Sequence, residues 1–316
     1  MLLSFAIPST APLITAPVPI FLTVMAIILL TPLVLSRLKI PQVIGLIIAG
    51  VAVGPYGLNL LARDMSFEVF GQVGILYLMF LAGIEIDMYH LRKNLRKGMA
   101  FGAFTFIIPL LLGTLTAMAA LGMHLLEAVL LASMFAAHTL IAYPIVNRFG
   151  VTKSPAVIIA IAGTIMTVLG SLIVLAGVLG VYRDGSLGSL VPVLFYLALY
   201  CVGITYLYPR ITRYFFKHYS DGISQFIYVM VAVFGAAALA SFIGIEGVFG
   251  AFFAGLVLNR FIPARSTLMG RLEFVGNALF IPYFLIGVGM LIDLRVVLDG
   301  WGTLYTAAVM SAVAMA

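Results

Sequence analysis

The most chemically informative stretch of this sequence is LLASMFAAHTLIAYPIVNRFG, residues 130–150, which places polar side chains and a proline inside an apolar run. Its centre carries His138, Thr139, Tyr143 and Pro144. A proline within a helix removes one backbone hydrogen bond and crowds the preceding turn. In hydrocarbon the freed backbone groups need partners from protein or water, so Pro144 predicts a broken helix beside a polar cavity.

At such a break, the hydroxyl group of Thr139 can bind a cation and the imidazole of His138 can carry a proton. Each residue also has an ordinary structural interpretation. A threonine hydroxyl can bond to its own helix backbone, and a single buried histidine usually contributes to packing. The sequence leaves both interpretations open.

A second polar pattern lies in SPAVIIAIAGTIMTVLGSLIVLAGV, residues 154–178. Thr164, Thr167 and Ser171 are three and four residues apart, which places their hydroxyl groups on one face of a helix. Such a face can bind a partly dehydrated cation or pack closely against another helix. Glycine recurs every seven residues in the same segment, at Gly163, Gly170 and Gly177. This repeat favours close helix packing.

Three acidic residues border apolar runs. Glu85 and Asp87 end the motif FLAGIEID, directly before a basic stretch. They can form interfacial ion pairs with Arg92 or Lys93, or they can line an ion pathway. Glu246 stands at the start of another apolar run, where it can be a charge at a helix N-terminus or a functional acid.

The composition indicates an integral membrane protein. Apolar residues make up 64% of the 316 residues and charged residues 9%, which is too little polar surface to cover a soluble globule. The single cysteine, Cys201, cannot form an internal disulfide or a cysteine-based metal cluster. Motifs of the GxSxG, HExxH and Walker types are absent, which favours a transporter without a cofactor over an enzyme.

Ten apolar windows approach the length of roughly 20 residues that a spanning helix needs. They lie near residues 18–36, 41–58, 69–87, 99–121, 127–147, 155–181, 190–208, 223–243, 246–261 and 273–293. A partial eleventh window runs from Gly302 to Ala316. The gaps between windows are short, so we expect one transmembrane transporter domain over residues 1–316, incomplete at its C-terminus and without a soluble domain.

The basic residues alternate between the gaps. Of the 17 Lys and Arg residues, 14 follow odd-numbered windows, and only Arg63, Arg183 and Arg295 follow even-numbered ones. Because short cytoplasmic loops retain Lys and Arg, this pattern predicts a multi-pass protein of the plasma (inner) membrane with its N-terminus outside. The same pattern accounts for the net charge of +6, so the expected partner is the lipid bilayer and not nucleic acid.

In their order and spacing, five motifs resemble the cation:proton antiporter superfamily, in the branch of bacterial sodium/proton exchangers and Kef-type systems. They are IPQVIGLIIAGVAVGP, FLAGIEID, AAHTLIAYPIVNRFG, GVFGAFFAGLVLNR and IPYFLIGVGMLID. The resemblance implies an all-α inverted-repeat bundle and a homodimer. It also implies exchange of sodium or potassium for protons by alternating access, with the helix at residues 127–147 as one of two broken helices that cross in mid-membrane.

The resemblance also implies an ion-binding aspartate, preceded by a polar residue, in the sixth helix. An ungapped alignment places Thr167 and Val168 at these two positions, and the window 155–181 holds no carboxylate. Thr167 can coordinate a cation but cannot titrate near neutral pH.

Three hypotheses follow from this departure. The first is an antiporter whose proton site has moved to Glu246, the first candidate because a buried carboxyl group can titrate near neutral pH, or to His138. The second is a cation facilitator without proton coupling. The third is a transport-inactive membrane sensor on the same fold.

Overall fold

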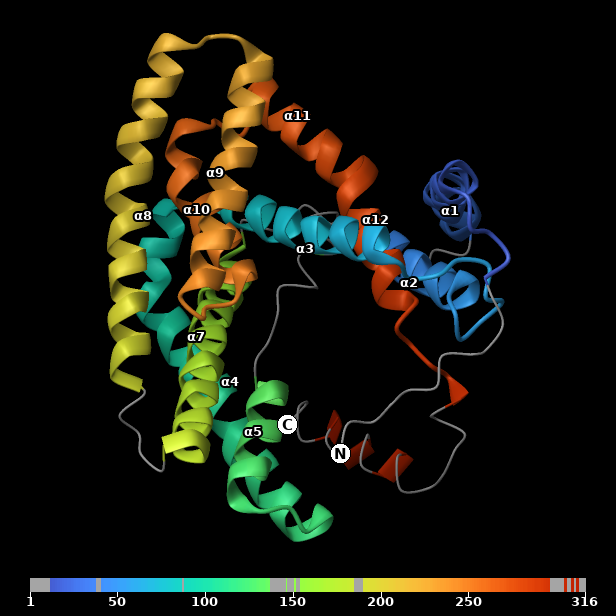
Figure 1. Cartoon of the computed structure of the whole chain (residues 1–316). Helices are drawn as coiled ribbons and strands as arrows, with labels where there is room; N and C mark the ends of the chain where they lie inside the picture. Colours follow the sequence, from blue (N-terminus) through green and yellow to red (C-terminus); the bar gives the residue numbers. More distant parts are fainter. Residues whose placement is uncertain are drawn as a thin grey trace. The chain divides into compact units, whose positions relative to one another are not determined.

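The computed structural model describes residues 12–37, 41–86, 88–136, 154–184 and 190–295, with positions 146, 151, 304–305, 308–309 and 311–312. Most of these residues are helical (Figure 1). Among them, the one β-type pairing is a parallel bridge between Ile14 and Leu61.

The helices lie close to the windows expected from the sequence. In chain order they are α1 (Pro17–Arg37), α2 (Gln42–Val53), α3 (Met65–Glu85), α4 (Met88–Leu121), α5 (Leu125–Ala136), α7 (Pro155–Asp184), α8 (Leu190–His218), α9 (Gly222–Phe242), α10 (Gly247–Leu258), α11 (Thr267–Val275) and α12 (Ile281–Gly289). A 3-10 turn, Asn259–Phe261, follows α10, and a π-helical turn, Gly276–Phe280, joins α11 to α12.

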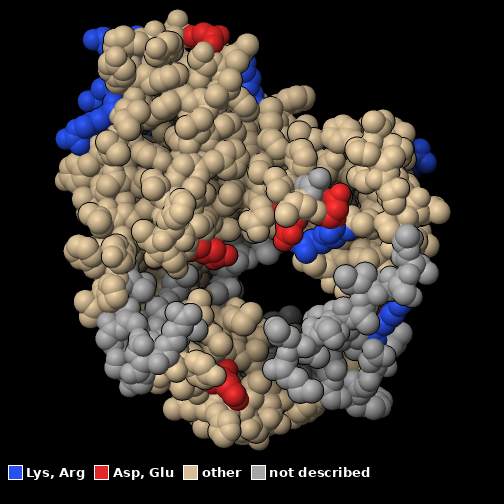
Figure 2. Space-filling model, in the orientation of Figure 1, with Lys and Arg blue, Asp and Glu red and all other residues tan. Residues whose placement is uncertain are grey.

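Seven helical segments of the described residues are long and apolar enough to cross a membrane, judged by length and composition. Three shorter apolar segments, Gln42–Val53, Leu125–Ala136 and Gly247–Phe261, complete the ten expected windows. Large apolar side chains such as Leu22, Leu33 and Phe104 are more than half exposed, as expected of helices that face lipid. Figure 2 shows the same character, with charged side chains in small, separate groups on a mostly uncharged surface.

Several helix ends differ from the sequence-based windows. The basic run Arg92–Lys97 was expected in a loop but lies inside α4, and Arg210, Arg213 and Lys217 lie inside α8. Hydropathy windows stop at the first charges, whereas Lys and Arg are good helix formers outside the hydrocarbon. The 29 residues of α8 would extend about 43 Å, beyond a hydrocarbon core of about 30 Å. In contrast, α2 ends at Val53, five residues before the end of its window, because a turn follows at residues 54–58.

The chain divides into two compact units, residues 1–78 with 270–300, and residues 79–269 with 301–316. In the first unit, α2 packs against α12 through glycines. A Cβ atom on Gly50 would overlap the carbonyl oxygen of Ile286, and one on Gly54 would press on the Cα of Met290 at 2.9 Å. Because Gly50 faces Ile286 and Gly54 faces Met290, α2 and α12 run parallel.

The π-helical turn in the first unit precedes a proline. Pro282 has no N–H group to donate to the carbonyl one turn earlier, and widened turns of this kind accompany such interruptions. From α3, the hydroxyl group of Tyr77 donates to the carbonyl oxygen of Leu272 at 2.9 Å. The ring of Tyr283 lies 5.3 Å from Phe67 and 5.0 Å from Phe70, so aromatic packing joins α12 to α3.

In the second unit, α4 and α7 pack through small residues. A Cβ atom on Gly102 would lie 2.8 Å from the Cα of Gly163, and one on Gly170 would lie 2.8 Å from the Phe106 ring. Residue numbers at these contacts rise in the same direction along both helices, so α4 and α7 are parallel. Two glycines of the seven-residue repeat, Gly163 and Gly170, therefore serve close helix packing, as the repeat predicted.

The α8–α9 hairpin of the second unit is held by hydroxyl groups. The contacts are Tyr200 Oη to the Ala236 carbonyl at 3.0 Å, Tyr208 Oη to the Ala232 carbonyl at 2.9 Å, and Thr212 Oγ1 with Tyr228 Oη at 2.7 Å. Residue numbers rise on α8 while they fall on α9, so the two helices are antiparallel. At the turn, the Asp221 side chain accepts hydrogen bonds from the N–H groups of Ile223 and Ser224 and caps α9.

These relative directions agree with a chain that crosses the membrane once per helix. Crossings that are both even-numbered traverse the membrane in the same direction. Counted along the chain, α2 and the α11–α12 segment form one such pair and α4 and α7 form another, and the helices of each pair are parallel. The consecutive crossings α8 and α9 are antiparallel. The helix count from the sequence and the packing within each unit are therefore mutually consistent.

Candidate functional site

The residues predicted to form the helix break lie outside the described part of the chain. These are His138, Thr139, Tyr143 and Pro144, and Asp87 is likewise outside it. The preceding helix, α5, ends at Ala136. The broken helix and its cation site therefore stay predictions.

The hydroxyl face of α7 is described, and its two threonines bond within their own helix. Thr167 is only 1% exposed, and its Oγ1 donates to the Thr164 carbonyl at 3.0 Å. Thr164 Oγ1 donates to the Ala160 carbonyl at the same distance, and Ser171 is half-buried. Thr167 lies between Gly163 and Gly170, the two glycines that contact α4. The hydroxyl groups of Thr164 and Thr167 are thus engaged by their own helix, and a cation-binding role for this face stays a prediction.

No acidic residue of α7 lies near the position that the antiporter resemblance assigns to an aspartate. Val168 occupies that position and is half-buried. α7 does extend beyond its sequence window to Asp184, its last residue. The 16 residues from Val168 to Asp184 correspond to about 24 Å along a helix. Residue 184 is therefore remote from the position of Val168 along the helix.

Glu246 is the residue that precedes α10, and its side chain is exposed and makes no capping hydrogen bond. The expectation of a buried carboxyl group at this position is wrong. A carboxylate at a helix N-terminus is favoured by the helix dipole, which explains an acid here without a transport role. Any part of Glu246 in the ion pathway stays a prediction.

The structure places Asn259, a residue that sequence reasoning missed, against the backbone on either side of Glu85. Glu85 is the last residue of α3 and is half-buried. The side-chain amide of Asn259 donates to the carbonyl oxygens of Ile84 and, at 3.0 Å, of Ile86. Asn259 directly follows the apolar run of α10, and its position as the only amide in GVFGAFFAGLVLNR was the available signal.

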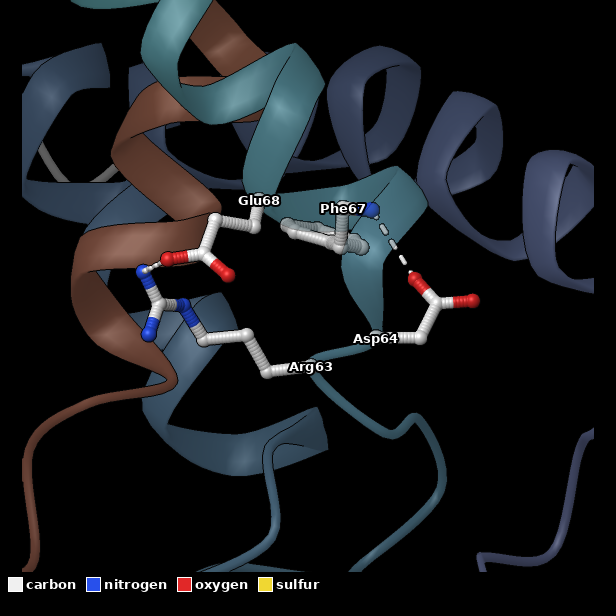
Figure 3. Close-up of polar contacts among 4 residues, drawn as sticks. All are labelled: Arg63, Asp64, Phe67 and Glu68. Carbon is white, nitrogen blue, oxygen red and sulfur yellow. Dashed lines mark hydrogen bonds and ion pairs between the residues drawn. The ribbon is translucent and has the colours of Figure 1, made fainter.

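At the other end of α3, charged residues organise the first turn (Figure 3). The Asp64 carboxylate accepts a hydrogen bond from the Phe67 N–H at 2.9 Å, and Arg63 Nη2 lies 3.9 Å from Glu68 Oε1. Both members of this ion pair are substantially exposed, so the pair contributes little stability. Arg63 is one of the three basic residues outside the main alternation, and its local partner gives it a structural role.

Seven helices of the described residues have the length and apolar composition of membrane spans, which places the chain in the class of multi-pass membrane proteins. The family model described as "Sodium/hydrogen exchanger, transmembrane" matches residues 24–316. The chain therefore belongs to the sodium/hydrogen exchanger family. This confirms the superfamily resemblance, and the family is one named for transport and not for an enzymatic reaction.

Two relatives and one solved structure show how far the similarity extends. The chain is 36% identical to the Na(+)/H(+) antiporter NhaS5 of Synechocystis, over 95% of this chain and 43% of that protein. It is 29% identical to the probable Na(+)/H(+) antiporter 3 of Methanocaldococcus jannaschii, over 89% and 73%. The electron-microscopy map of the sodium proton antiporter MjNhaP1 from the same organism gives a TM-score of 0.68 at 18% identity, over 88% and 71%. The all-α antiporter fold is thereby confirmed.

Proposed function

We propose that this protein is a secondary active transporter that exchanges a monovalent cation, sodium or potassium, for protons by alternating access. The family match over residues 24–316 is the observation that carries the proposal. Relatives named as sodium/proton antiporters, and a K(+)/H(+) antiporter 1 of Saccharomyces cerevisiae at 24% identity, support this class of substrate. The chain spans less than half the length of NhaS5, so exchange is proposed for the protein and not transferred from that relative. The facilitator and sensor alternatives gain no support from these relatives.

For the cation site we propose Thr139, at the predicted helix break, rather than Thr167. The Thr167 hydroxyl is buried and engaged by its own helix, which supports this choice. Unwound backbone around Pro144 would supply further oxygen ligands for a cation.

Thr139→Val is expected to weaken cation-driven proton flux in proteoliposomes while the protein still assembles, because it removes a coordinating hydroxyl and keeps the volume. Thr167→Val is the matched control. It deletes the same group from a position where the hydroxyl serves only the helix backbone, and flux should be retained. Full transport by Thr139→Val, or equal losses in both variants, would contradict the proposed site.

We further propose a plasma-membrane location with the N-terminus outside, and a homodimer as the functional assembly. The 14-to-3 distribution of Lys and Arg supports the orientation. The inner ends of α4 and α8 then carry exposed Lys93 and Arg213. The homodimer rests on the resemblance to the antiporter superfamily.

The orientation predicts which side of the membrane each helix end reaches. With Cys201 replaced by serine, single cysteines at Leu95, beside Lys93, and at Tyr214, beside Arg213, should react with an impermeant thiol reagent only from the cytoplasm. A cysteine at Leu58, which is 70% exposed after α2, should react only from outside and serves as the control. Labelling of the cysteines at positions 95 and 214 from outside intact cells would show that the predicted orientation is wrong.

A further inference from the structure

The inner ends of α3 and α10 are joined by hydrogen bonds from one side chain to backbone carbonyl groups. The last carbonyl groups of a helix have no partners within it. At the end of α3, the carbonyls of Ile84 and Ile86 both accept from the side-chain amide of Asn259. An Asn side chain has two N–H donors, so Asn259, the first residue of the 3-10 turn after α10, satisfies two carbonyls at the end of α3. These carbonyls belong to the residues on either side of Glu85.

Below this contact, the two helices touch without intervening side chains. A Cβ atom on Gly83 would overlap the Phe252 carbonyl oxygen, and one on Gly255 would overlap the Phe80 carbonyl oxygen. The neighbouring Ala82, on α3, is fully buried. Gly83 meets Gly255 and residues 84 and 86 meet Asn259, so α3 and α10 run parallel and end together. The main chain around Glu85 is therefore held by α10 and not only by its own helix.

We propose that Asn259 is a positioning residue for Glu85, and that the Glu85 carboxylate receives the transported cation at the cytoplasmic mouth of the pathway. The half-buried position of Glu85 allows contact with a cation from solvent. A carboxylate attracts cations and binds them through oxygen, whereas Asn259 fixes the peptide groups that aim it. The second half of this proposal rests on the exchange activity proposed above. The alternative is that Asn259 is a helix cap whose loss affects stability alone.

Transport kinetics separate these roles. Sodium-driven proton flux is measured in inside-out vesicles for wild type, Asn259→Ala, Glu85→Gln and the double variant, as sodium is varied on the cytoplasmic face. Loss of the two hydrogen bonds of Asn259 should raise the apparent KM for sodium about tenfold, with little change in maximal rate. The double variant should be no worse than Glu85→Gln, because Asn259 acts through Glu85. Additive effects, or a lower maximal rate at unchanged KM, would show a structural cap only.

A second measurement does not depend on transport. In a Cys201→Ser background, Glu85→Cys is labelled from the cytoplasmic side with a hydrophilic thiol reagent, with and without Asn259→Ala. Release of the α3 end should raise the labelling rate about tenfold. Arg260→Ala, at the adjacent exposed position, should leave the rate unchanged. An unchanged rate in Asn259→Ala would overturn the positioning role even if the wild type proves to transport no cations.

If Asn259→Ala does not accumulate in the membrane, Asn259→Asp takes its place in both experiments. Aspartate keeps the shape of the side chain, but when ionised it has no donor for the two carbonyls. Asn259→Gln keeps both donors and should restore part of the sodium affinity. Two results together would exclude the proposal. One is that Asn259→Gln does not restore sodium affinity, and the other is that Asn259→Asp has the KM for sodium and the labelling rate of the wild type.

Discussion

Proteoliposomes that contain His138→Gln should lose cation-driven proton flux that the wild-type protein shows. An antiporter needs a group that releases a proton when the cation binds, and the helix that resembles the ion-binding helix of the superfamily carries Thr167 and Val168 where that family has its aspartate. Histidine can titrate near physiological pH without a large shift of its pKa. The measurement is sodium- or potassium-driven proton flux, with residual flux compared with that of empty liposomes.

Glu246→Gln is the matched comparison for His138→Gln. The exposed position of Glu246 at the start of α10 leads us to expect that coupled flux survives this substitution. If coupled proton flux is lost in Glu246→Gln and retained in His138→Gln, the carboxylate of Glu246 is the proton site. Coupled exchange left intact in both variants would exclude both candidates.

Val168→Asp tests the facilitator hypothesis in the same assay. If the wild type carries cations without protons and Val168→Asp gains coupling, the protein is a facilitator on an antiporter scaffold. If the wild type is already coupled, the added aspartate is not required.

Gly50→Ala is expected to lower the thermal midpoint of the detergent-solubilised protein. The added Cβ atom would overlap the Ile286 carbonyl oxygen and lie 3.0 Å from the Cα of Gly289. Both are backbone atoms, so no side-chain rotation can relieve the overlap and α2 must separate from α12. Overpacking of this kind costs roughly 1–3 kcal/mol or more.

Gly71→Ala is the control for this prediction because it lies in α3 of the same unit. A Cβ atom there would have no heavy atom of a neighbouring element within 4 Å among the described residues. The substitution should be neutral or stabilise by up to about 1 kcal/mol, since alanine favours the helix more than glycine does. A stable Gly50→Ala protein, or equal losses in both variants, would show that the α2–α12 contact is not close-packed.

The positions of the helices could be predicted from the sequence because a spanning segment must be apolar along its length. Their ends could not, since residues such as Arg96 in α4 and Arg213 in α8 remain helical after the hydropathy falls. The π-helical turn at Gly276–Phe280 was also missed. It precedes Pro282, but a proline in a sequence does not say whether the helix kinks, ends or widens there.

The candidate site was less predictable than the fold. Thr167 has the same spacing whether its hydroxyl binds a cation or a carbonyl of its own helix, and only the three-dimensional packing distinguishes the two. Glu246 has apolar neighbours in the sequence, yet its side chain is exposed in the structure. The hydrogen bonds of Asn259 could not be predicted, because their acceptors, the carbonyls of Ile84 and Ile86, are backbone groups that no sequence motif records.

The hydroxyl contacts between α8 and α9 determine how this hairpin can move. Sliding one helix past the other by a single turn, about 5.4 Å, would carry all three contacts beyond hydrogen-bond reach together. Tilting the pair as one piece leaves them intact. We therefore expect the hairpin to move as one rigid body. In a conformational change, the backbone dihedral angles should change in the residues that flank the hairpin and not within its two helices.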